Sequence, residues 1–129
     1  MKRVLLPKRI LLALTPLLLA ATPPQPRAVQ ISDVDYPDAA REAGVEGDVS
    51  FDLLIDAKGK VSGCEITAGA NLPAGLAADT CAVASARWRY APARDDAGQK
   101  VPGRVHHAIA WRILKRCPPA DAQTICVFL

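Results

Sequence analysis

Four cysteines are the residues whose type and spacing most directly predict chemistry in this chain. They are Cys64, Cys81, Cys117 and Cys126. No two of them form a C-x-x-C pair, and their spacing from the histidines does not resemble a zinc site. In an exported chain an even count of cysteines predicts two disulfides, with three possible connectivities. We expect the local pairing, 64 with 81 and 117 with 126; free buried thiols are the alternative.

The other polar residues do not combine into a catalytic site. His106 and His107 are adjacent on a predicted strand, so their side chains point to opposite faces and cannot share one ligand. Asp52 and Asp56 have the spacing of a solvated strand face, which we favour over a catalytic carboxylate pair. The serines lack a G-x-S-x-G context, and no glycine-rich phosphate loop is present. We therefore expect no enzymatic activity, no metal, no cofactor and no small-molecule substrate.

The first 21 residues have the three parts of a secretory signal peptide. A basic head precedes about a dozen almost purely apolar residues, and small residues ending near Ala21 follow. A retained membrane anchor is the alternative. However, the apolar run makes only about 18 Å of helix against a hydrocarbon core of about 30 Å, and Pro16 interrupts it. We predict an exported protein, cut near residue 21.

Removal of this segment changes the charge balance. The full chain has 16 Lys+Arg and 13 Asp+Glu, and four of the basic residues precede position 10. The exported chain then has 16 − 4 = 12 basic against 13 acidic residues, about −1. The basic character therefore belongs to the export signal, and nucleic-acid binding loses its main support.

The remaining sequence divides into a linker, a domain and a tail. Residues 22–35 form a Pro-rich and then polar linker, and residues 114–129 form a tail with a small disulfide loop but no further predicted role. Between them, helical patterns cover residues 38–43 and 74–88, and the second of these carries an apolar stripe at helical spacing. Period-two alternation predicts strands over residues 47–56, about 60–68 and 104–113, with a bulge near Ser62-Gly63.

These elements predict an α+β fold for residues 36–113. Two helices would cover one face of a three-stranded antiparallel sheet, in the order α-β-β-α-β. Trp88 and Trp111 fall on inward faces and are expected in the core. Nothing in the third strand blunts its edge with proline or lysine, so that edge is expected to be open.

In this order the motifs resemble the C-terminal domain of the TonB family of Gram-negative energy transducers. The resemblance rests on Tyr36-Pro37 before a short Ala-rich helix, the Gly44-Val45-Glu46-Gly47 step, the hairpin Asp56-Ala57-Lys58-Gly59-Lys60-Val61, and the run Arg87-Trp88-Arg89-Tyr90-Ala91-Pro92-Ala93. It covers about residues 36–113.

The resemblance implies a periplasmic binding role. Domains of this family grip an extended segment, the TonB box, of outer-membrane TonB-dependent receptors, by adding it as a strand to the third strand. The docking edge implied for this chain is Arg104, Val105, His106, His107, Ala108, Ile109 and Ala110, with the segment before Tyr36 nearby.

The chain differs from the family pattern before its domain. It has no convincing membrane helix, and about ten linker residues reach only about 30 Å even as polyproline. Two alternatives therefore stay open. The protein is retained in the inner membrane and faces the periplasm, or it is an envelope assembly module without energy transduction. Such a module would pair through its free sheet edge with a second copy or with another envelope protein.

Overall fold

The computed structural model describes residues 20–114, Cys117 and residues 123–129. The predicted signal peptide, except Ala20 and Ala21, lies outside these residues. Within the described ranges no helix combines the length and the apolar character needed to cross a membrane. Both predicted disulfides are present with the local pairing, Cys64–Cys81 and Cys117–Cys126.

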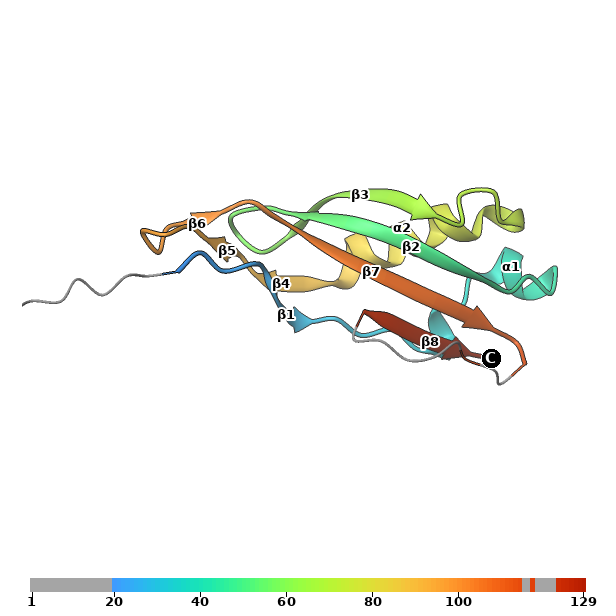
Figure 1. Ribbon diagram of the computed structural model, residues 1–129. Coiled ribbons are helices and arrows are strands. Elements are labelled where there is room, and N and C mark those ends of the chain that lie inside the picture. Colours follow the sequence, from blue (N-terminus) through green and yellow to red (C-terminus); the bar gives the residue numbers. More distant parts are fainter. Residues whose placement is uncertain (1–19, 115–116, 118–122) are drawn as a thin grey trace, which may run out of the picture.

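The central element is a four-stranded mixed sheet in the order β3-β2-β7-β8 (Figure 1). Its strands are β2 (Gly47–Ile55), β3 (Val61–Ala68), β7 (Gly103–Arg112) and β8 (Thr124–Phe128). β2 pairs antiparallel with β3 and with β7, whereas β8 runs parallel to β7. The α+β class and the three predicted strands are confirmed. The three-stranded antiparallel sheet needs correction, because the tail adds a fourth, parallel strand.

Local chemistry explains the β2–β3 hairpin. Alternate residues of β2, from Val49 to Ile55, are fully buried. At the turn the Asp56 carboxylate accepts hydrogen bonds from the amides of Lys58 and Lys60, at 2.8 and 3.0 Å, and Gly59 has φ +85°. The pairing shifts register between Leu54 and Ile55, which confirms the bulge predicted near Ser62-Gly63.

Both helices contribute to the core on one side of the sheet. α1 (Asp38–Glu42) follows Pro37 and buries Ala40, while α2 (Leu76–Arg87) buries Leu76, Thr80 and Ala84. α2 begins two residues later than predicted, because Ala74 and Gly75 have left-handed backbone conformations in the preceding 3-10 turn. The Cys64–Cys81 disulfide joins α2 to β3.

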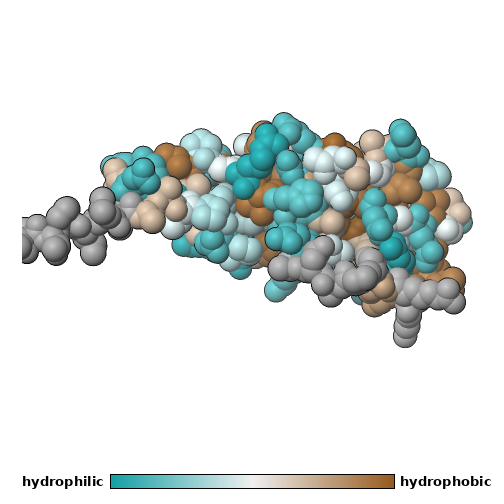
Figure 2. Space-filling view, in the orientation of Figure 1, coloured by the Kyte–Doolittle hydropathy of each residue, from teal (hydrophilic) through white to brown (hydrophobic). Residues whose placement is uncertain are grey.

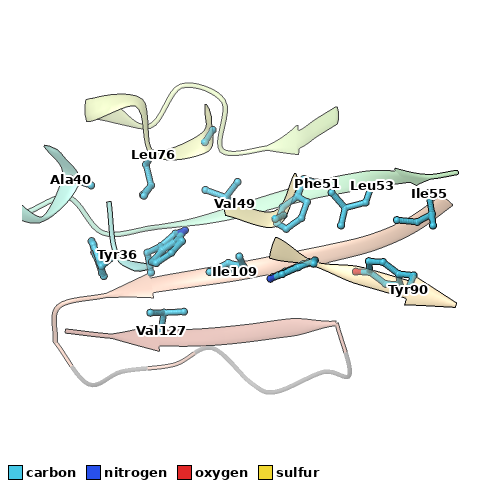
Figure 3. Packing of buried hydrophobic residues seen from close by; sticks show 14 residues of the cluster. Tyr36, Ala40, Val49, Phe51, Leu53, Ile55, Leu76, Tyr90, Ile109 and Val127 are labelled. Carbon is cyan, nitrogen blue, oxygen red and sulfur yellow. The ribbon is translucent and has the colours of Figure 1, made fainter. Parts of the chain in front are cut away.

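The core is formed by the inward side chains of the sheet, which pack against residues of these helices (Figure 3). Trp88 and Trp111 are both fully buried, as predicted. The indole Nε1 of Trp111 donates to Oγ1 of Thr80 at 2.9 Å, and Tyr36 meets the same indole edge-on, with ring centroids 5.1 Å apart. Through these contacts, Tyr36 before α1 and Thr80 of α2 both pack against Trp111 of β7.

Four short strands, which the sequence did not predict, form two small sheets beside the main one. β1 (Gln25–Ala28) pairs antiparallel with β4 (Arg89–Ala91). β5 (Ala93–Arg94) and β6 (Lys100–Val101) form a small hairpin, in which the Asp95 carboxylate accepts hydrogen bonds from the amides of Ala97 and Gln99. The segment 22–35, expected as a linker, therefore lies along the domain, and it ends in a 3-10 turn at Asp33–Asp35.

Candidate strand-docking edge

The predicted docking residues alternate between the two faces of β7. Val105, His107 and Ile109 lie on the core side, with His107 and Ile109 buried. Arg104 and His106 lie on the outer face and are about half exposed. The alternation predicted for this strand is confirmed, and the exposed side chains on the outer face are those of Arg104 and His106, because Ala110 is fully buried.

β7 is not an open edge over its whole length, which corrects the sequence-based expectation. β8 pairs with residues 108–112 of β7, from Ala108 opposite Thr124 to Arg112 opposite Phe128. The amide of Ala108 donates to the Gln123 carbonyl at 3.1 Å, and the amide of Leu129 donates to the Arg112 carbonyl at 3.0 Å. The sequence signal for β8 is its run of β-branched and aromatic residues, only five residues long and isolated behind two prolines.

The first half of β7 has a free side. Among the described residues, no strand pairs with residues 103–107 on the side away from β2. Backbone groups alternate in direction along a strand, and Ala108 points its amide toward β8. The amides of Arg104 and His106 therefore point to the same side, beyond the start of β8. Strand addition needs such backbone donors.

Charged side chains form a connected row on the outer face beside this stretch. The Arg104 guanidinium contacts Glu65 at 2.8 Å and Asp52 at 3.0 Å, and Nδ1 of His106 lies 2.7 Å from the other Asp52 oxygen. These hydrogen bonds, first from His106 and then from Arg104, lower the pKa of Asp52. The contact with Glu65, followed by that with Asp52, raises the pKa of Arg104. Figure 2 shows hydrophilic side chains gathered over the middle of the visible face.

His107 has a different environment on the core side. Its Nε2 lies 2.7 Å from the Tyr90 hydroxyl, and its ring packs edge-on against Trp88, with centroids 5.0 Å apart. Burial lowers the pKa of His107, while the Gln123 carbonyl raises it by a smaller amount. Nδ1 makes no hydrogen bond of normal geometry within the described part of the chain. Burial also raises the pKa of Tyr90 to about 12. His107 therefore packs in the core, on the face opposite to His106, as the predicted strand alternation requires.

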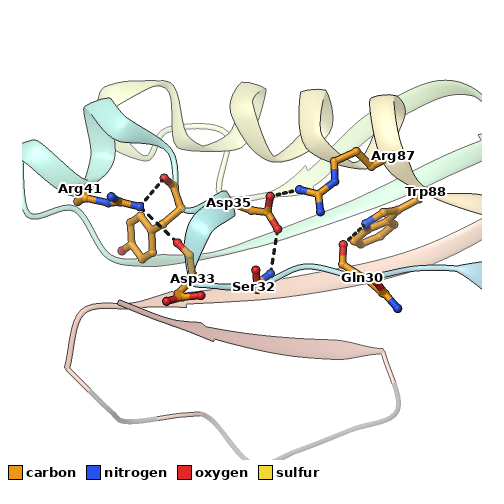
Figure 4. A network of polar contacts seen from close by, with 8 residues as sticks. Gln30, Ser32, Asp33, Asp35, Arg41, Arg87 and Trp88 are labelled. Atoms are coloured by element: carbon orange, nitrogen blue, oxygen red, sulfur yellow. Dashed lines mark hydrogen bonds and ion pairs between the residues drawn. The ribbon is translucent and has the colours of Figure 1, made fainter.

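The segment before Tyr36 is anchored by a polar network (Figure 4). Asp35 pairs with Arg87 of α2 and accepts a hydrogen bond from the Ser32 amide at 2.9 Å. The Gln30 carbonyl accepts a hydrogen bond from Nε1 of Trp88 at 3.1 Å. The charge of Arg87 at the end of α2 is therefore paired with a carboxylate of the N-terminal segment.

An open groove of about 510 Å³ lies between this segment and β8. It is lined by Val29, Gln30, Ile31, Ser32, Asp35, Arg87 and Ile125. One wall thus comes from the N-terminal segment and another from the core-side face of β8, so β8 is covered less completely than the strands beneath α2. In the groove and throughout the described ranges, no group of three or more His, Cys, Asp or Glu could hold a metal ion.

Comparison with known proteins identifies a family for most of this structure. The family model described as "Gram-negative bacterial TonB protein C-terminal" matches residues 32–113. No curated protein and no solved structure matches the chain. The matched range is more than half of the 129 residues and includes α1, β2, β3, α2 and β7, but neither β1 nor β8. The chain therefore belongs to the family of Gram-negative bacterial TonB protein C-terminal domains.

Proposed function

We propose that this chain is a periplasmic module that binds an extended segment of an outer-membrane receptor in TonB-dependent transport. The segment would add as a strand to the side of the sheet beyond β7. The family supports the class of partner. The observation that carries the location is the free side of residues 103–107, next to a stretch of β7 that already holds a parallel strand.

The physical basis of such binding is the backbone of β7. Main-chain hydrogen bonds supply affinity in strand addition, and pockets for alternate side chains supply selectivity. The amides of Arg104 and His106 supply the donors. On the outer face, the partner's side chains would lie next to Arg104 and His106, whose own partners Asp52 and Glu65 lie on β2 and β3; this favours polar side chains at those positions.

A peptide titration tests the proposal. A peptide with the receptor segment is added to the isotopically labelled chain, and we expect amide resonances of residues 103–108 to shift more than those of β3. A peptide N-methylated at alternate positions cannot donate to the ladder and should bind at least tenfold more weakly. Titration without any response along β7 would contradict strand addition there.

Variants of His106 separate the backbone from the side chain. His106→Pro removes an amide on the free side and should weaken peptide binding about tenfold or more. His106→Gln keeps that amide and removes only the imidazole next to Asp52, so it is the matched control and should weaken binding much less than His106→Pro does. Equal binding by both variants would argue against a backbone-mediated site at this position.

Periplasmic location depends on the first 21 residues and is proposed with them. Mass spectrometry of the protein from cell envelopes should find a chain that begins near Thr22. Recovery of intact Met1 would favour the alternative, a chain retained in the inner membrane and facing the periplasm.

A second candidate function is envelope assembly through the opposite edge. No described strand lies beyond β3, so Val61–Ala68 offers a second free edge to another copy or to another envelope protein. Sedimentation with and without the receptor peptide distinguishes the two functions. A dimer that persists when peptide is bound would favour assembly through β3.

A further inference from the structure

We propose that a partner strand can displace β8 from its pairing with β7, and that the Cys117–Cys126 disulfide determines how strongly β8 competes with that partner. This inference rests on the proposed function. It adds a regulation of the same site by the chain's own C-terminal strand.

The two strands would compete for the same backbone groups. The docking stretch implied for β7 runs from residue 104 to residue 110, and β8 already pairs with residues 108–112. The Ala108 amide, for example, is bonded to the Gln123 carbonyl at 3.1 Å. A partner that pairs along the whole docking stretch must therefore displace at least the first residues of β8.

β8 is held less firmly than the rest of the sheet. Among the described residues it pairs with β7 alone, and of its five residues only Val127 is buried, at 2% exposure. Ile125 is half-buried and lines the open groove. By contrast, β2 pairs on both sides and has four fully buried side chains. Edges with little buried surface open at lower free energy than the core, so β8 can leave while β2 and β7 stay paired.

The disulfide shortens the tether that returns β8 to its place. Cys126 lies opposite Ala110 in the middle of β8, and its bridge to Cys117 has a Cα–Cα distance of 6.1 Å. Through the bridge, Cys126 is joined to the end of β7 by 117 − 112 = 5 residues; without it the path is 126 − 112 = 14 residues. Because effective concentration falls as about the −3/2 power of tether length, loss of the bridge should weaken the return of β8 about fivefold.

Hydrogen exchange of the exported chain tests the opening of β8 directly. The variant Cys117→Ser/Cys126→Ser should exchange its β8 amides about fivefold faster, whereas the interior amides of β2 keep their rates. Val127→Ala keeps the bridge but removes packing, and should also speed exchange in β8. Exchange of β8 only together with β2, through global unfolding, would overturn the proposal.

Binding of the receptor peptide by the same variants tests the competition. The affinity of a site that is open for a fraction of the time rises with that fraction. Both variants should therefore bind the peptide several-fold more tightly than the original chain. Equal affinity in all three chains would overturn the competition and leave the proposed function standing. Absence of binding in all three, even with β8 loosened, would overturn both.

Discussion

At the scale of single residues, burial of His107 makes the free energy of unfolding depend on pH. Its pKa is lowered by burial against Trp88 and Tyr90, so the folded state binds its proton less readily than the unfolded state does. The unfolded state therefore binds more protons below about pH 6.5, the ordinary histidine value. The free energy of unfolding must fall as pH decreases from there toward the lower pKa of the folded state.

We predict that His107→Gln reduces this loss of stability in acid. The wild-type slope from His107 is at most about 1.4 kcal/mol per pH unit, the value for one proton. Urea unfolding midpoints between pH 7 and pH 5 measure it. Identical slopes for His107→Gln and wild type would mean that His107 does not contribute.

Thr80 supports a second residue-scale prediction. Its hydroxyl donates to the Leu76 carbonyl at 2.7 Å and accepts from Trp111 Nε1 at 2.9 Å, and the residue is fully buried. Thr80→Val keeps the shape but leaves the indole N–H without an acceptor, and should cost about 1–3 kcal/mol of unfolding free energy. Thr80→Ser retains the hydroxyl and should lose less. Chemical denaturation decides, and an unchanged midpoint for Thr80→Val would contradict the role of this bond.

At the scale of elements, the β2–β3 hairpin depends on one close approach. A Cβ at Gly59 would lie 1.9 Å from the Tyr90 carbonyl oxygen, and the Tyr90 amide bonds to the Gly59 carbonyl at 2.9 Å. The turn is thus attached to β4, which follows α2 directly. Such a contact explains why glycine is needed here for space as well as for its positive φ.

We predict that Gly59→Ala destabilises the protein by more than about 3 kcal/mol, because overlap with backbone adds to the left-handed strain. Gly44→Ala is the matched control. Gly44 has φ +66°, but a Cβ added there would have nothing within 4 Å, so only about 1–2 kcal/mol of strain is expected. Thermal unfolding of both variants measures the difference. Equal losses would mean that the approach to Tyr90 is easily relaxed.

At the scale of the whole molecule, the folded unit extends beyond the range of the family match. The match begins at residue 32, yet β1 pairs with β4 and the Gln30 carbonyl holds the Trp88 indole. Val29 and Ile31 also pack against the core. These residues close the end of the core that α2 leaves uncovered, so they belong to the domain.

We therefore predict that a chain starting at Ser32 is less stable than one starting at Ala20 by about 3 kcal/mol, from lost apolar burial and hydrogen bonding. Tryptophan fluorescence should shift to longer wavelength as Trp88 becomes exposed. Urea unfolding followed by this emission measures both effects. Equal midpoints for the two chains would show that the first segment only lies on the surface.

Local patterns were sufficient for the part of the fold that short-range chemistry determines. The alternation from Val49 to Ile55, the turn at Asp56–Gly59 and the alternation of β7 predicted three strands, because side-chain period follows directly from strand geometry. The stripe on α2 follows in the same way from the period of a helix, and the two cysteine pairs were predicted from their short separation in an exported chain. The packing of His107 also follows from parity along one strand.

Only the tertiary structure decided what lies beyond β7 and along β4. β8 is five residues long, and β1 contains Pro26, so neither segment has a strong strand signal alone. Each forms because a distant strand, 108–112 or 89–91, presents backbone groups to it. Such pairing depends on contacts between residues far apart in the chain, which no local pattern encodes. The sequence by itself therefore determined the family, the core face and the three strands of the matched domain, whereas the fold decided how much of the third of these strands is free.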